Sequence, residues 1–137
     1  MRLITKNTDY AITALCALAG QPGRTMAVSA LARELNISHA FLRKLFQILE
    51  KHGVLTSRKG RGGGFALAKP TDRIALSDIM ETLQGPVKIG DCLVRKKVCQ
   101  RTAHCVLRQK LMTIERHLVA ELGTLTIASL INQEDDR

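Results

Sequence analysis

Hydrophobic residues between positions 38 and 52 recur at intervals of three and four, a spacing that predicts an amphipathic helix. Ser38 can cap the start of this helix, and Gly53 can take the left-handed conformation in which many helices end. The apolar face comprises Phe41, Leu42, Leu45, Phe46, Ile48 and Leu49. The opposite face is polar and basic toward its N-terminal end, where it carries Ser38, His39, Arg43 and Lys44.

A glycine-rich, basic segment follows this helix and predicts a β-hairpin. Residues 54–57 and 65–68 are short strand candidates, and the glycines between positions 60 and 64 give the connecting loop free φ angles. Three cations lie in this turn: Arg58, Lys59 and Arg61. The hairpin and helix indicate either an ordinary solvated surface or a winged helix, in which the helix enters a DNA major groove and the hairpin lies along the backbone.

The segment before the helix favours the winged helix. A first helix is predicted from Thr8 or Asp9 to about Ala19, and a short second helix near residues 29–35. A tight turn at residues 36–37 joins the second helix to the basic one, which makes a helix-turn-helix at about 28–52. We therefore expect Arg43 and Lys44, with Ser38 and His39 beside them, to face the bases, and the wing cations to contact phosphates or the minor groove.

Two further helices are predicted beyond the hairpin. Ser77 can cap a helix that Gly85-Pro86 stops, and a long helix spans about 104–122, with Gly123 closing it. Its narrow apolar seam comprises Leu107, Leu111, Ile114, Leu118 and Leu122. A seam this narrow favours pairing with the same helix of a second subunit, and the alternative is packing within one chain.

The chain is therefore expected to be mainly α, with a winged helix-turn-helix, a two-stranded wing (54–68) and a long dimerisation helix. Thr124 or Thr126 can begin a short helix after the long one. The expected division is a DNA-binding domain at 1–84, a cysteine-bearing loop at 85–105, the dimerisation helix and short terminal helix at 104–132, and a tail at 133–137.

Charge narrows the range of partners and activities. The net charge is +9, and residues 33–69 carry eight Lys or Arg against two acids, so a polyanion such as DNA is the expected partner. Acidic proteins or RNA are the alternative. No apolar run approaches the roughly 18 residues of a membrane helix, and we expect a cytoplasmic protein with no membrane partner. No nucleophile–base constellation or phosphate loop before a helix indicates an enzyme.

Three cysteines within fourteen residues are the pattern that implies chemistry beyond packing: Cys92, Cys99 and Cys105. The cations at 95–97 and 101 make an electropositive setting that suits metal binding or thiol oxidation. His104 can complete a Cys₃His zinc set. Spacing alone leaves zinc, an iron–sulfur cluster and a thiol redox switch open, whereas Cys16, inside an apolar helical pattern, is expected in the core.

The whole chain resembles the Rrf-two (IscR/NsrR-type) family of winged-helix iron–sulfur transcription regulators. The matching segments are Met1-Arg2-Leu3, Thr8-Asp9-Tyr10-Ala11, Gly62-Gly63-Gly64-Phe65 with Leu67, the three cysteines before a long helix, and the ending at 124–130. The resemblance implies a homodimer that binds double-stranded operator DNA, usually to repress. It also implies that the three cysteines hold a two-iron or four-iron cluster.

The resemblance also bears on the fourth cluster ligand. In the IscR branch a histidine stands three residues after the third cysteine, but here that residue is Arg108, which cannot ligate. In the NsrR branch an aspartate in the first helix of the partner subunit completes the site, and Asp9 matches it. Asp9 is therefore the first candidate and His104 the second. The NsrR-like branch is slightly favoured, so nitric oxide, redox or iron–sulfur status is the expected signal; zinc or a thiol switch without a cluster is the alternative.

Overall fold

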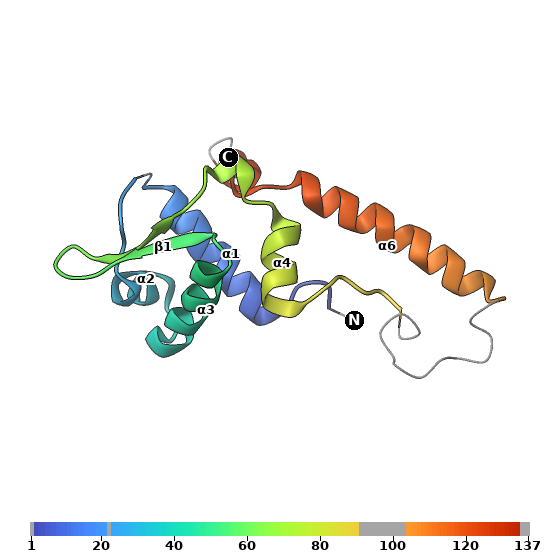
Figure 1. Ribbon diagram of the computed structural model, residues 1–137, viewed down its shortest axis with the longest axis horizontal. Helices are drawn as coiled ribbons and strands as arrows, with labels where there is room; N and C mark the ends of the chain where they lie inside the picture. The colour runs from blue at the N-terminus through green and yellow to red at the C-terminus, as the bar shows by residue number, and fades with distance from the viewer. Residues whose placement is uncertain (1, 22, 91–103, 135–137) are drawn as a thin grey trace.

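The computed structural model describes residues 2–21, 23–90 and 104–134 (Figure 1). These residues form a mainly helical fold with a two-stranded antiparallel sheet, as the sequence predicted. In chain order the elements are α1 (Lys6–Ala19), α2 (Val28–Leu35), α3 (His39–Lys51), β1 (Leu55–Arg58), β2 (Gly64–Leu67), the 3₁₀ turn η1 (Thr71–Arg73), α4 (Leu76–Gln84), α6 (Val106–Thr124) and α7 (Ile127–Glu134).

Local capping signals explain where the first three helices begin and end. Helix α1 begins at Lys6, earlier than predicted, because the Thr5 hydroxyl accepts a hydrogen bond from the Thr8 amide at 3.3 Å. Helix α3 begins after Ser38, whose Oγ accepts from the Phe41 amide at 3.5 Å, as predicted. It ends before Gly53, whose φ of +79° is left-handed, and this prediction is also confirmed.

The core lies between α1, α2, α3, α4, α7 and the wing. Along α3 the fully or nearly buried residues are Leu42, Leu45, Phe46 and Leu49. Phe46 packs edge-on against Phe65 of β2, with ring centroids 5.3 Å apart. Phe41 and Ile48, predicted on the same face, are only partly buried because they lie at its edges, where Phe41 meets Tyr10 of α1 at 5.9 Å.

The wing is the β1–β2 hairpin, with Arg58 paired to Gly64 at its loop end. Its strands lie within one residue of the predicted ranges. A third segment joins it: the Met26 amide donates to the Phe65 carbonyl and the Phe65 amide to the Met26 carbonyl, each at 2.9 Å. Gly64 has a φ of +149°, and a Cβ at this position would overlap the Met26 carbonyl oxygen. Glycine is therefore required where the chain before α2 approaches the wing.

Backbone pairing between distant segments sets the start of α4. The Leu76 amide donates to the Leu125 carbonyl at 2.8 Å, and Ala75 and Thr126 form an isolated bridge. Helix α4 thus begins without a side-chain cap, and the predicted capping role of Ser77 is wrong. The helix ends before Gly85, as predicted.

The long helix α6 begins and ends two residues later than predicted, at Val106 and Thr124. Gly123 does not close it; the helix continues to Thr124, whose hydroxyl donates to the Glu121 carbonyl at 2.7 Å, and the next residue, Leu125, is extended and paired with α4. Helix α7 then begins after Thr126, whose hydroxyl accepts from the Ser129 amide at 3.2 Å, as predicted.

Within the described residues, α6 packs on the rest of the chain mainly through its C-terminal half, and the helix projects away from the winged helix (Figure 1). Leu122 is buried against Leu76 and Met80 of α4. Toward the other end, Leu107 is 67% exposed and Ile114 54% exposed. Against the described residues, the predicted seam is therefore buried at Leu122, partly buried at Leu111 and Leu118, and exposed at Leu107 and Ile114.

Candidate nucleic-acid interface and cysteine site

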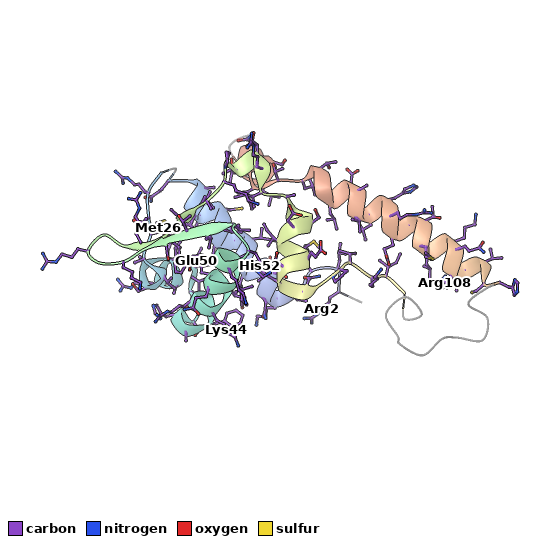
Figure 2. All side chains as sticks on the ribbon, in the orientation of Figure 1. Arg2, Met26, Lys44, Glu50, His52 and Arg108 are labelled. Atoms are coloured by element: carbon purple, nitrogen blue, oxygen red, sulfur yellow. The ribbon has the colours of Figure 1, made fainter. Side chains whose placement is uncertain are left out.

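The polar face of α3 is exposed as the sequence predicted. Ser38, His39, Arg43 and Lys44 are all exposed, and Lys44 lies on the outer side of the helix (Figure 2). Arg43 and Lys44 stand between the buried residues Leu42 and Leu45, so the core contacts of α3 hold these cations outward.

The turn before α3 sets the angle of that helix to α2. Asn36 takes a left-handed conformation with φ of +54°, and the Ile37 amide donates to the Ala32 carbonyl at 2.9 Å. Asparagine tolerates this conformation better than most residues. The turn presents α3 as the second helix of a helix-turn-helix, the position that enters a major groove.

The wing cations Arg58, Lys59 and Arg61 are exposed as well. Two side-chain hydrogen bonds tie the wing to the body. The Ser57 hydroxyl donates to Glu50 Oε1 of α3 at 2.6 Å, and the Thr25 hydroxyl donates to the Gly62 carbonyl at 2.6 Å. Sequence reasoning missed both contacts, because neither pair shares a periodic pattern.

These two basic groups are electrostatically available. Within the described residues, the cations of α3 and the wing form no ion pair with an acid. The ion pair found there joins Lys88 to Glu115, far from α3 in the chain. Exposed Arg and Lys side chains on a recognition helix and an adjacent hairpin can contact phosphates and base edges together.

Of the predicted cysteine ligands, the structure describes Cys105, which is half-buried and caps the start of α6. Its Sγ accepts a hydrogen bond from the Arg108 amide at 3.4 Å. Cys92 and Cys99 lie outside the described residues. His104 is exposed, and Cys16 is half-buried on α1, packed against the core as predicted.

The two residues that bear on the fourth ligand differ in environment. Asp9 is exposed in the first turn of α1, beside the buried Thr8. Arg108 is only half-exposed, and its Nε is buried with no hydrogen-bond partner among the described residues. Within residues 2–21, 23–90 and 104–134, no three His, Cys, Asp or Glu side chains group as a metal site.

Two side chains near the start of the cysteine-bearing segment, Glu115 and Gln84, make polar contacts that the sequence did not suggest. Glu115 of α6 accepts from Lys88 Nζ at 3.1 Å and from the Ile89 amide at 3.3 Å. Gln84, the last residue of α4, contacts three residues of the N-terminal segment: Leu3, Thr5 and Thr8. The partners lie far apart in sequence, so no local signal could have found them.

No helix in the described parts of the chain is both long and apolar enough to cross a bilayer.

Comparison with known proteins gives one family and one fold. The Rrf2 family model, described as an iron-dependent transcriptional regulator, matches residues 4–133. The solved structure of CymR (YrzC), the global cysteine regulator of B. subtilis, has a TM-score of 0.80 at 24% identity, covering 97% of this chain and 98% of that one. IscR of T. potens has a TM-score of 0.76 at 21% identity, covering 96% and 87%. The oxidized form of S. aureus CymR has a TM-score of 0.73 at 22% identity, covering 96% of each chain.

Proposed function

Because the chain belongs to the Rrf2 family of transcriptional regulators, we propose that it is a homodimeric repressor whose affinity for operator DNA is set by an iron–sulfur cluster. DNA binding is supported by the two exposed basic surfaces, one on α3 and one on the wing. The Ser57–Glu50 and Thr25–Gly62 hydrogen bonds fix the wing to the helical part of the domain. A rigid pairing of helix and wing allows one docking geometry on a duplex.

The residues divide into base-reading and backbone-contacting groups. Arg43 lies near the start of the recognition helix, where a guanidinium can donate two hydrogen bonds to guanine. Lys44, Ser38 and His39 lie beside it. Arg58, Lys59 and Arg61 extend from the wing and would neutralise phosphates, which contributes salt-dependent affinity for any sequence.

The exposed apolar side chains of α6 support dimerisation. They are Val106, Leu107, Met112, Ile114 and Val119. Leu107 and Ile114, seven residues apart, lie on one stripe of α6, and an exposed apolar stripe of this kind is a common subunit interface that a second copy of α6 would offer in return. Dimerisation would place two recognition helices at a fixed spacing on a palindromic operator.

The donor set fits an iron–sulfur cluster. Cys92, Cys99 and Cys105 supply three thiols, and the Cys105 Sγ, at the N-terminus of α6, already accepts a backbone hydrogen bond that would also stabilise a thiolate. Asp9 of the partner subunit is the proposed fourth ligand, supported by its exposure, and His104 is the second choice. A bound cluster would supply an iron that reacts with nitric oxide or oxidants.

The packing of α4 suggests how loss of the cluster could change DNA binding. Gln84 joins the N-terminal end of α1, which carries Asp9, to the end of α4. Helix α4 packs on α1, on α3 and on α6. A change in the position of α1 or α6 on cluster loss would therefore move the recognition helices relative to one another.

The cluster part of the proposal is tested by an absorbance spectrum of protein purified without oxygen, with iron, sulfide and zinc assayed on the same sample. Visible charge-transfer bands with matched iron and sulfide are expected. Zinc alone, or no metal after anaerobic reconstitution, would instead favour the thiol or zinc switch and leave the DNA-binding proposal standing.

A further inference from the structure

Lys6, the first residue of α1, is an exposed cation that lies over an aromatic ring. Its Nζ is 5.5 Å from the centre of the Tyr10 ring, one turn along the same helix. Within the described residues, Lys6 forms no ion pair with an acid. A cation in the first turn of a helix opposes the helix dipole, so the charge of Lys6 does not stabilise α1. It is available to an anion outside the protein.

Tyr10 places this cation at the edge of the recognition helix. The Tyr10 ring packs edge-on against Phe41, with the ring centroids 5.9 Å apart. Phe41 lies in the first turn of α3 and is partly buried at the border of its core face. The contacts from Lys6 to Tyr10 and from Tyr10 to Phe41 therefore hold a cation of α1 beside the start of α3.

The wing is joined to the opposite flank of α3. Its Ser57 hydroxyl donates to Glu50 Oε1 at 2.6 Å. Glu50 follows Phe41 by nine residues, which is about two and a half turns, so the two side chains leave α3 on opposite sides. The exposed face that carries Arg43 and Lys44 lies between these two flanks. The face expected to read bases is therefore bordered by α1 on one side and by the wing on the other.

We infer that Lys6 is a phosphate contact on the side of the major groove opposite the wing. A helix in the major groove has a phosphate backbone on each side, one from each strand. The wing cations would meet the backbone on the Glu50 side, and the Lys6 ammonium would donate to a phosphate on the Phe41 side. This makes α1 a third DNA-contacting element. The inference rests on the proposed function, since it extends the same DNA-binding surface.

Substitutions separate the charge of Lys6 from its packing. Lys6→Ala removes the cation and Lys6→Arg keeps it. Tyr10→Leu removes the ring under the cation and leaves an apolar contact for Phe41. Lys59→Ala marks the wing contact for comparison. Lys110→Ala is the matched control, because it removes the same charge from an exposed site on α6.

The probe is a duplex that the wild-type protein selects from a random-sequence pool. Binding is measured over a range of salt concentrations, in the cluster state that binds more tightly, and phosphate contacts are mapped by ethylation interference. Lys6→Ala should bind about fivefold more weakly near 0.15 M salt and lower the salt slope by about one, as the loss of one phosphate contact requires. Interference should disappear at a phosphate on the strand opposite the one affected by Lys59→Ala.

The other variants show whether Lys6 acts through its charge. Lys6→Arg and Lys110→Ala should keep the wild-type slope, and Tyr10→Leu should weaken binding less than Lys6→Ala does. Thermal unfolding of Lys6→Ala should occur at or above the wild-type temperature, because the removed cation opposed the helix dipole.

The outcomes distinguish this inference from the proposed function. A wild-type salt slope and interference pattern in Lys6→Ala would overturn the inference and leave the assigned contacts of α3 and the wing intact. Loss of thermal stability in Lys6→Ala with an unchanged interference pattern would also overturn it, since Lys6 would then have a structural role. A wild-type protein that selects no duplex would overturn the DNA-binding proposal as well.

Discussion

Gln84 Oε1 accepts a hydrogen bond from the Thr8 hydroxyl at 2.8 Å, and Thr8 is a completely buried polar residue. The same oxygen accepts from the Thr5 amide at 3.0 Å, and Gln84 Nε2 donates to the Leu3 carbonyl at 2.8 Å. One side chain thus holds the chain before α1 and the first turn of α1 against the end of α4.

Replacing Gln84 with Ala should lower the free energy of unfolding by about 1–3 kcal/mol, because the buried Thr8 hydroxyl loses its best acceptor and the Thr5 amide is left unpaired. Urea unfolding measures the effect. Gln109→Ala, which truncates an exposed glutamine on α6, is the control and should change little. Equal stability of Gln84→Ala and wild type would show that water replaces these contacts at no cost.

The Arg43→Ala variant should bind its operator more weakly and discriminate less between operator and mutated sites, by about 1–3 kcal/mol at the base that Arg43 contacts. Fluorescence anisotropy against a panel of single-base operator variants measures both quantities. Arg73→Ala removes the same charge from an exposed site on η1 and serves as the control. A loss of affinity that is uniform across the panel would reassign Arg43 to a phosphate contact.

Two glycines of the wing should respond differently to substitution by Ala. Gly60→Ala places a Cβ in open space at a φ of +91° and should cost about 1–2 kcal/mol of backbone strain. Gly64→Ala adds an overlap with the Met26 carbonyl oxygen and should cost more, since the Met26–Phe65 pairing must open. Thermal unfolding of the two variants compares them directly. If Gly64→Ala were the milder change, the chain before α2 could not be packed on the wing as described.

Asp9 and Asp78 form a matched pair for the fourth-ligand proposal, because each is an exposed acid in the first turn of a helix. Neutralising either as Asn should change stability by a similar amount, about 0.3–1 kcal/mol, through the helix dipole. Only Asp9→Asn should alter the visible spectrum of the loaded protein and speed its reaction with nitric oxide or oxygen. An unchanged spectrum in Asp9→Asn would shift the assignment to His104 or another ligand.

Local signals allowed much of the fold to be predicted. Ser38, Gly53 and Gly85 mark helix ends through their own conformational preferences, and the period of apolar residues along α3 separates its core face from Arg43 and Lys44. The exposure of Arg43 and Lys44 therefore followed from the sequence. Their role on DNA stays a prediction.

Long-range pairing accounts for what the sequence did not predict. Ser77 is not a cap, because Leu76 instead pairs with Leu125, and Gly123 does not end α6, because the helix continues to that same pairing. The contacts of Gln84 and Glu115 join residues 26 to 81 positions apart. Such contacts depend on tertiary packing, which no periodicity encodes.

In the proposed mechanism, the state of the cysteine site sets the affinity for operator DNA. The most direct test measures operator binding by one protein preparation, anaerobically loaded with its cluster and then stripped by a chelator, at fixed salt and with the dimer confirmed in both states. The loaded form should bind at least tenfold more tightly than the stripped form, and nitric oxide should lower its affinity to that of the stripped form. Equal affinity of the loaded and stripped proteins for the same operator would contradict the proposed mechanism.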